Sequence, residues 1–326
     1  MTINQPLRRA AEERPRAALI AGPTASGKSA LAVALALALR DAGQDAVVIN
    51  ADASQVYADI PILSAQPSEA ERKGIPHRLF GHIDGAEDYS AARWAAEART
   101  EVVAAHKAGA IPIIVGGTGL YIRTLLQGIA PVPAIDEAIR ADIRALPVRE
   151  AYRRLRSADP HAAASLKPLD VTRIARALEV VASTGTPLHI WQERREGGMA
   201  DALNITPLIL LPPREWLRER CDIRLAAMFS GGAADEVAAL VARQLDPQLP
   251  VMRAIGVRQL VAAQAGEISL ADALTLAQAA TRQYAKRQYT WFRGQTPDDW
   301  PHYLESLNNN SVDDLAIKLR ETVLTA

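Results

Sequence analysis

A chain of 326 residues can form two domains, or one large domain that carries an insertion. It has 37 basic and 37 acidic side chains, and this zero net charge restricts any nucleic-acid contact to local basic patches. Cys221 is the only cysteine, which excludes an internal disulfide framework and a zinc site made of cysteine pairs.

Residues 1–15 are polar and charged, and we expect them to form a flexible leader. They contain no apolar stretch of the kind that a signal peptide needs. No apolar run, including the Ala- and Leu-rich residues 30–39, is long enough to span a membrane. We therefore expect a cytoplasmic enzyme.

The apolar residues 17–21 predict a buried strand, and an Ala- and Leu-rich helix is predicted from residue 30 to residue 40. Between them lies GPTASGKS, which fits G-x-x-x-x-G-K-[ST] and predicts a P-loop that cradles phosphate oxygens. Lys28 would add a positive charge, and the Ser29 hydroxyl could bind Mg²⁺. The predicted diphosphate-binding residues are Gly22, Pro23, Thr24, Ala25, Ser26, Gly27, Lys28 and Ser29. The loop predicts a pyrophosphate or triphosphate ligand but does not identify the reaction.

Residues 46–50 predict a second buried strand, and Asp52 follows directly after it. In open α/β sheets, ligands bind at the edge formed by the carboxyl ends of the strands. A carboxylate beside a P-loop at this edge can bind Mg²⁺ or act as a general base. An aspartate that only caps a turn is the structural alternative.

The next segments continue the alternation of strands and helices. Residues 79–83 are expected to form an edge strand, residues 91–108 a helix capped by Ser90, and residues 111–115 a third strand. This order predicts an α/β fold, a parallel sheet of the P-loop type that is covered by helices on both faces. The glycine-rich residues 116–119 then place Thr118 at the same sheet edge, although a simple tight turn is an equal alternative.

Pro131 and Pro133 mark a change in composition, after which the chain is expected to be helical only. We predict a core domain of residues 16–135 and 206–326 with a helical insertion at 136–205. An apolar strand at residues 208–211 resumes the sheet. Closing helices are expected at residues 214–229, 234–244, 253–265, 269–291 and 311–323.

Basic side chains recur at helical spacing near the end of the chain. Arg282, Lys286 and Arg293 share one predicted helix face, with Arg287 beside it. Aromatic and polar side chains at Tyr284, Gln288 and Trp291 lie on a neighbouring face, and further basic pairs occur at Arg173 and Arg176 and at Arg253 and Arg258. Such interleaving suits a nucleic-acid backbone with stacked bases, whereas a solvated helix face is the alternative for any one patch.

Several of these motifs together resemble the tRNA dimethylallyltransferase (IPP transferase) family, over residues 18–293. The resemblance depends on GPTASGKS at 22–29, NADASQVY at 50–57, PHRLFGHID at 76–84, YSAARW at 89–94, PIIVGGTGLY at 112–121, RIARALEV at 173–180, RAIGVRQL at 253–260 and AKRQYTWFR at 285–293. It implies transfer of a dimethylallyl group from dimethylallyl diphosphate to N6 of adenine 37, in tRNAs that read codons beginning with U, with release of pyrophosphate. It also implies Mg²⁺ as cofactor and a helical insertion that grips the anticodon stem-loop. We expect a monomer with no membrane partner.

The resemblance also assigns roles to residues. Asp52 would accept the proton of the adenine amine, and Ser29 would lie near the metal. The implied catalytic residues are Asp52, Lys28, Thr118 and Arg258. The implied tRNA-binding residues are Asp52, Ala53, Ser54, Gln55, Thr118, Arg140, Thr172, Arg173, Ile174, Ala175, Arg176, Arg253, Gly256, Arg258, Lys286, Arg287, Trp291 and Arg293.

The chain departs from the family pattern in two places. Ala53 stands where the family commonly has serine, and the loop at residues 58–66 lacks an Arg and a Lys that the family commonly carries. Three other functions fit the P-loop by itself: a small-molecule kinase, an adenylate isopentenyltransferase that acts on free AMP, and an RNA-binding module without activity. The absent lid signature argues against the kinase. The insertion and the basic C-terminal helix argue against a free-nucleotide substrate.

Overall fold

The structure is a computed structural model that describes residues 14–325. The chain forms two compact units: a sheet unit, which ends at Leu125 and resumes at Met199, and a helical unit from Leu126 to Gly198. The helical unit starts and ends earlier than residues 136–205, because the two connecting segments already pair with each other through Ile129 and Glu196. The predicted leader lies almost entirely outside the described residues.

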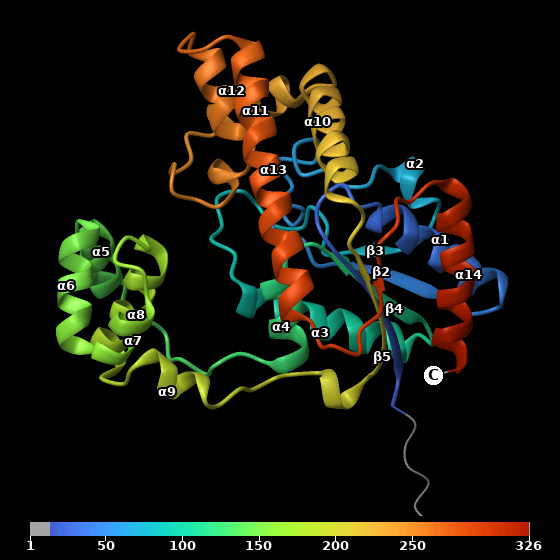
Figure 1. Cartoon of the computed structure of the whole chain (residues 1–326), viewed down its shortest axis with the longest axis horizontal. Coiled ribbons are helices and arrows are strands. Elements are labelled where there is room, and N and C mark those ends of the chain that lie inside the picture. Colours follow the sequence, from blue (N-terminus) through green and yellow to red (C-terminus); the bar gives the residue numbers. More distant parts are fainter. Residues whose placement is uncertain (1–13, 326) are drawn as a thin grey trace, which may run out of the picture. The chain divides into compact units, whose positions relative to one another are not determined.

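The sheet unit is built on a six-stranded parallel sheet (Figure 1). The strands are β1 (Arg16–Ala21), β2 (Ala46–Asn50), β3 (His77–Arg78), β4 (Ile111–Gly116), β5 (Asn204–Leu210) and β6 (His302–Tyr303). Their order across the sheet is β3-β2-β4-β1-β5-β6, and every neighbouring pair is parallel. The predicted α/β fold is therefore confirmed.

Both faces of the sheet are buried, as parallel sheets require. On one face, Ile20 and Ile113 pack with α1 (Lys28–Asp41) and α14 (Asn309–Thr325), through leucines such as Leu35. The alternating residues Leu19 and Ile114 point to the other face and are also buried. There α3 (Ala91–Lys107) contacts β2 and β4, and its N-terminus is capped by Ser90 as predicted.

The remaining helices of the sheet unit are α2 (Glu69–Arg72), α4 (Gly119–Gln127), α10 (Arg214–Ser230), α11 (Ala233–Ala242), α12 (Val257–Gln264) and α13 (Leu270–Gln295), with 3₁₀ turns at Ala200–Ala202 and Val251–Arg253. Helix α4 runs two residues into the helical unit. Within residues 14–325 no single helix is both long and apolar enough to cross a membrane. Only α10 and α11 taken together, bent by 64° at the break between them, reach that length and composition.

Two strand predictions need correction. The edge strand expected at residues 79–83 is wrong: the strand is His77–Arg78, because Leu79 (φ 62°) and Gly81 (φ 55°) leave the extended conformation. The strand expected at residues 208–211 starts earlier, at Asn204. The two-residue strand β6 is too short to produce a pattern in the sequence, and the tertiary structure alone places it beside β5.

The helical unit contains five helices around its own core (Figure 1). They are α5 (Glu137–Ala145), α6 (Val148–Ala158), α7 (Pro160–Ser165), α8 (Val171–Thr184) and α9 (Leu188–Gln192). Leu155 and Ile174 are fully buried at the centre of this core, and Ile143 and Leu178 pack around them. The short α7 is preceded by Asp159, whose side chain caps its N-terminus.

Candidate active site

Three loops meet at the carboxyl edge of the sheet, because β4 lies between β1 and β2. The loops that follow β2 and β4 are joined by hydrogen bonds in both directions. The N–H of Thr118 donates to the carbonyl of Ala51 at 3.1 Å, and the N–H of Ala53 donates to Oγ1 of Thr118 at 2.9 Å. Thr118 therefore fixes the backbone on both sides of Asp52, which is a positioning contact that the sequence does not reveal.

The loop between β1 and α1 has the backbone conformation that its sequence predicts. Ala25 (φ 62°) and Gly27 (φ 94°) are both left-handed, and this turns successive N–H groups toward a common centre. Ala25 adopts this conformation although it is not glycine, a strain that is commonly found at functional sites. A side chain at Gly22 would lie 2.4 Å from the carbonyl oxygen of Leu210 in β5, so this position requires glycine.

Lys28 lies buried beneath the loop. Its Nζ donates a hydrogen bond to the carbonyl of Pro23 at 2.6 Å. Burial lowers the pKa of Lys28 to about 8, against the opposing attraction of Asp52. A bound anion would replace the missing solvation and restore the full charge of the ammonium group. A buried lysine with a lowered pKa is a setting that favours a bound anion.

Two arginines of α10 reach the same loop, and the sequence analysis did not name them. Arg224 donates to Oγ1 of Thr24, and Nε of Arg220 donates to the carbonyl of Ala25 at 3.2 Å. Burial lowers the pKa of Arg224, while the charge of Asp52 raises it. The two arginines are one helical turn apart and so share a face, but their sequence spacing does not indicate what that face contacts.

Helix α13 joins two of the loops through Gln288. The N–H of Thr24 donates to Oε1 of Gln288 at 2.8 Å, and Nε2 of Gln288 donates to the carbonyl of Gly117 at 2.8 Å. Trp291 packs so closely that a side chain at Gly119 would lie 2.4 Å from its ring. The glycines after β4 therefore leave room for the side chains of α13. The sequence alone had suggested that they either approach a ligand or form a tight turn.

Asp52 is half-buried, and its two carboxylate oxygens differ. Oδ1 accepts hydrogen bonds from the backbone N–H of Ser54 at 3.0 Å and from its hydroxyl at 2.7 Å. In the part of the chain that the structure describes, Oδ2 has no hydrogen-bond partner. The carboxylate is thus held in place by one oxygen and has a second oxygen available for a ligand or a proton.

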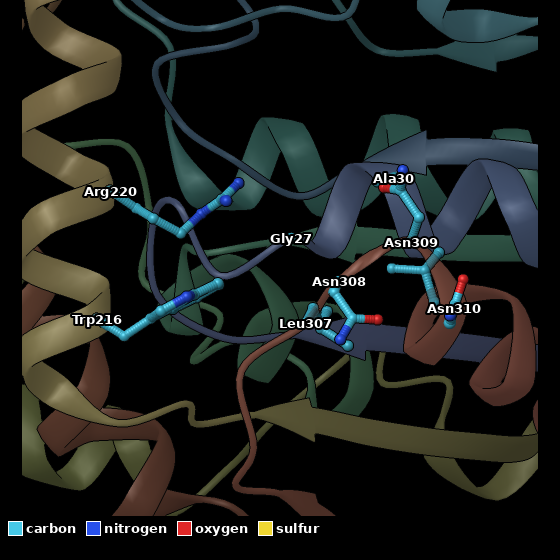
Figure 2. Close-up of a pocket in the computed structure, with 9 residues that line it drawn as sticks. Gly27, Ala30, Trp216, Arg220, Leu307, Asn308, Asn309 and Asn310 are labelled. Carbon is cyan, nitrogen blue, oxygen red and sulfur yellow. The ribbon is translucent and has the colours of Figure 1, made fainter.

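A cavity of about 540 Å³ lies on the outer side of the glycine-rich loop (Figure 2). Figure 2 shows Trp216 and Arg220 of α10 on one side and the segment before α14 on the other. The guanidinium of Arg220 lies 4.7 Å from the ring centre of Trp216. The residues that line the cavity are Gly27, Ala30, Trp216, Arg220, Leu307, Asn308, Asn309, Asn310 and Val312. Asp52 and Thr118 are not among them, so this cavity lies beside the glycine-rich loop after β1 and not at Asp52.

The other predicted residues of the sheet unit lie apart from the loop. Arg253 and Arg258 are exposed near the start of α12, and in residues 14–325 no hydrogen bond or ion pair joins Arg258 to the glycine-rich loop. Gly256 lies between them, with Leu63 packed against it. The Gln55 amide donates to the carbonyls of Ser64 and Ala65, so it holds the loop at residues 58–66.

The basic face predicted on α13 is largely exposed. Lys286, Arg287 and Arg293 are exposed to solvent, and the guanidinium of Arg287 lies 5.7 Å from the ring centre of Tyr284. Arg282 differs from them, because it forms an ion pair with Asp222 at 2.6 Å. Lys286, Arg287 and Arg293 form no ion pair with any residue that the structure describes.

The predicted residues of the helical unit fall on α5 and α8. Ile174 is buried in the core and Ala175 packs against it, whereas Thr172 and Arg173 are exposed. Arg176 lies near the buried Glu179 and near Arg140, and burial lowers the pKa of Arg176. Arg144, which the sequence analysis did not name, pairs with Glu179 at 2.9 Å. The helical unit thus gathers arginines around one carboxylate.

Oxygen ligands suited to Mg²⁺ are present beside the phosphate loop. The hydroxyl of Ser29 is exposed at the start of α1 and has no hydrogen-bond partner within the described residues. The free Oδ2 of Asp52 follows the end of β2, which β4 separates from β1. A hydroxyl and a carboxylate are hard oxygen donors of the kind that bind Mg²⁺ together with ligand phosphates.

Comparisons with known proteins agree with this geometry. The family model described as IPP transferase matches residues 55–295, and a second one, zeta toxin, matches residues 3–66, which include the glycine-rich loop. The tRNA dimethylallyltransferase of Sphingopyxis alaskensis is 65% identical over 308 residues, which cover 94% of this chain and 99% of that protein. The tRNA dimethylallyltransferase of Erythrobacter litoralis is 60% identical over 289 residues, covering 89% and 91%.

Solved structures with the same fold include a eukaryotic dimethylallyltransferase acting on tRNA. Its TM-score is 0.73 at 30% identity, over 85% of this chain and 70% of that one. The full-length tRNA isopentenylpyrophosphate transferase from Bacillus halodurans has a TM-score of 0.68 at 27% identity, over 96% of this chain and 99% of that one.

Proposed function

The chain belongs to the IPP transferase family, and we propose from this premise that it transfers a dimethylallyl group from dimethylallyl diphosphate to N6 of adenine 37 in tRNA, with release of pyrophosphate. Both compared relatives carry the name of this activity and match nearly the whole chain. One observation carries the site: the carboxylate of Asp52, which follows β2, is held by Ser54 and lies close enough to the buried Lys28 of the glycine-rich loop to affect its pKa.

The glycine-rich loop binds the leaving group in this proposal. Negative charge grows on the diphosphate as the bond between the allylic carbon and oxygen breaks. The inward N–H groups of the loop, Lys28 and Arg224 are the donors that stabilise it. Arg224 suits this role because it donates a hydrogen bond to Thr24 of the loop, whereas no hydrogen bond or ion pair among the described residues joins Arg258 to the loop. No phosphoryl group is passed on.

Asp52 acts on the acceptor. The adenine amine is a poor nucleophile because its lone pair is delocalised into the ring, so a base positioned on its proton helps the attack. The free Oδ2 of Asp52 is available for that proton, while Ser54 holds Oδ1 in place. Thr118 supports the backbone next to Asp52 and is therefore a positioning residue. The target base must leave its stack to reach the site, at a cost of a few kcal/mol.

Mg²⁺ is the cofactor that we propose, with Ser29 and the diphosphate oxygens as its ligands. When bound, Mg²⁺ supplies positive charge that neutralises the departing diphosphate. Lys28 and Arg224 stabilise the same oxygens from the protein side.

We further propose that the free cations of α13 and the arginines of the helical unit bind the tRNA backbone. Lys286, Arg287 and Arg293 are exposed and unpaired within the described residues, as phosphate contacts require. In the helical unit, Nε of Arg140 is buried without a hydrogen-bond partner in the described part of the chain, so a phosphate oxygen could satisfy it. The helical unit is the proposed grip on the anticodon stem-loop.

One assay separates the candidate functions. The purified chain is incubated with labelled dimethylallyl diphosphate or ATP, and with an anticodon stem-loop carrying A37, a matched stem-loop carrying G37, or AMP. We expect label only in the A37 RNA, with one pyrophosphate released per prenyl group. Label in AMP would identify a free-nucleotide enzyme, and transfer of the terminal phosphate of ATP to a small acceptor would identify a kinase. Either result contradicts the proposal.

A further inference from the structure

The helical unit contains a cluster of metal-binding side chains that the proposed reaction does not use. A carboxylate oxygen of Asp159 and one ring nitrogen each of His161 and His189 lie within 4.8 Å of one another. Asp159 stands between α6 and α7, His161 lies in the first turn of α7, and His189 belongs to α9. The cluster therefore joins two segments that are distant in the sequence.

The polar groups of this cluster lack the partners that buried groups normally have. Asp159 is only 1% exposed, and its Oδ1 caps α7 by accepting a hydrogen bond from the N–H of Ala162 at 2.9 Å. Its Oδ2 is buried and has no hydrogen-bond partner among residues 14–325, and the same is true of Nδ1 of His189. Buried polar atoms are nearly always hydrogen-bonded or bound to an ion, so two such atoms in one cluster point to a ligand.

The rings of His161 and His189 lie against each other. Their centres are 4.2 Å apart, at an angle of 36° between the ring planes. Two imidazoles and one carboxylate are a ligand set that zinc commonly uses, and they leave a fourth position for water. Tetrahedral bonds of about 2.0–2.1 Å place ligand atoms about 3.4 Å apart, so the side chains need to move by only about an ångström to close on an ion.

We propose that Asp159, His161 and His189 form a zinc site that fastens α9 to the junction of α6 and α7. Helix α9 has five residues. It is held to α8 by a hydrogen bond that Nε1 of Trp191 donates to Oγ1 of Thr184 at 3.3 Å. A metal would add a cross-link for α9, whose residues are not part of the core cluster of the unit. The site needs no cysteine, so the cysteine count does not exclude it.

The test uses the full chain without an affinity tag, freed of metal by a chelator and then titrated with Zn²⁺ or Co²⁺ in excess Mg²⁺. The excess Mg²⁺ occupies oxygen sites such as that at Ser29, so it restricts the titration to imidazole ligands. We expect about one tightly bound zinc ion per chain, and for Co²⁺ a visible absorption typical of a four- or five-coordinate site. Zinc should also raise the melting temperature.

Three variants make the test specific. His161→Gln removes an exposed ligand, and Asp159→Asn removes the negative charge while retaining an oxygen for the cap of α7. We expect each to weaken zinc binding at least 100-fold and to abolish both the cobalt absorption and the rise in melting temperature. The control His302→Gln, an exposed histidine of the sheet unit, should bind as the original chain does.

Comparison of metal-free melting temperatures shows whether the variants fold. If the unaltered chain binds no zinc, or if His161→Gln binds it with unchanged affinity, the proposal is wrong. The prenyl-transfer assay does not enter this test, so failure of the zinc site and failure of the proposed reaction are distinguishable.

Discussion

The backbone N–H of Thr24 donates a hydrogen bond to Oε1 of Gln288 at 2.8 Å, across 264 positions of sequence. Through its Nε2, the same buried side chain also holds the carbonyl of Gly117. Gln288 is therefore a clamp between the glycine-rich loop and the loop after β4. The position of the glycine-rich loop therefore depends on α13, a helix near the end of the chain.

Gln288→Leu should weaken donor binding and destabilise the fold. The substitution leaves the N–H of Thr24 and the carbonyl of Gly117 buried without partners, each at about 1–3 kcal/mol. We expect a fall in the free energy of unfolding, measured in urea, and a rise in the KM for dimethylallyl diphosphate. The control Gln295→Leu, at the exposed end of the same helix, should change neither quantity. If the KM of Gln288→Leu for dimethylallyl diphosphate is unchanged, Gln288 does not position the glycine-rich loop for donor binding.

Asp52→Asn should lose most turnover and keep tRNA binding. The amide has the size of the carboxylate but cannot accept the proton of the adenine amine, so kcat should fall by about 10²–10⁴-fold. Binding of a stem-loop, measured by filter retention, should stay within about threefold because the charge-dependent contacts lie elsewhere. Asp41→Asn, an exposed acid at the end of α1, is the matched control. Unchanged kcat in Asp52→Asn would falsify the assignment of the base.

Lys28 should take up protons when the diphosphate binds. Because burial lowers its pKa to about 8, the lysine is about half protonated at pH 8 in the free protein, and an anion would restore the charge. Calorimetry at pH 8 in buffers of different ionisation enthalpy should show uptake of up to about half a proton. The uptake should be absent from Lys28→Met. Equal uptake by both proteins would show that another group titrates.

The same pKa predicts how stability changes with pH. The unfolded chain holds the proton up to about pH 10.5, whereas folded Lys28 loses it near pH 8, so stability from this group rises with pH between the two values. Below pH 8 the full penalty for burying the charge is present. Lys28→Met should therefore be more stable than the unaltered chain at pH 7, by up to about 3 kcal/mol. This difference should shrink toward pH 10 in urea unfolding curves.

Arg287→Ala and Arg293→Ala should weaken tRNA binding in a salt-dependent way. Both side chains are exposed on α13, so each would contribute about one phosphate contact. We expect the slope of log K against log salt to fall in magnitude by about one for each substitution. Lys318→Ala on α14 is the control, since α14 packs against α1 on one face of the sheet. If the substitutions alter only the affinity for the diphosphate donor, the assignment to tRNA is wrong.

The sequence predicts correctly those elements whose determinants lie within one short segment of the chain. The glycine-rich loop with its flanking strand and helix, the cap at Ser90 and the alternation that makes a parallel sheet are all legible in consecutive residues. Their physical cause is also local, because backbone conformation, capping and burial periodicity act over a few residues. The prediction of an edge strand at residues 79–83 was wrong because nothing in the local sequence indicates the left-handed backbone conformation of Leu79.

The sequence by itself therefore determined the fold class, the glycine-rich loop after β1 and the carboxylate of Asp52 after β2. Only the tertiary structure decided which distant side chains complete the site: Gln288, Arg220 and Arg224 reach the glycine-rich loop from elements far away in the chain. It also supplied the contact by which Thr118, placed at this edge from the sequence, holds the backbone beside Asp52. It likewise brought His189 to Asp159. Such contacts depend on how helices pack across the sheet and within the helical unit, and packing joins residues whose sequence separation carries no periodic signal.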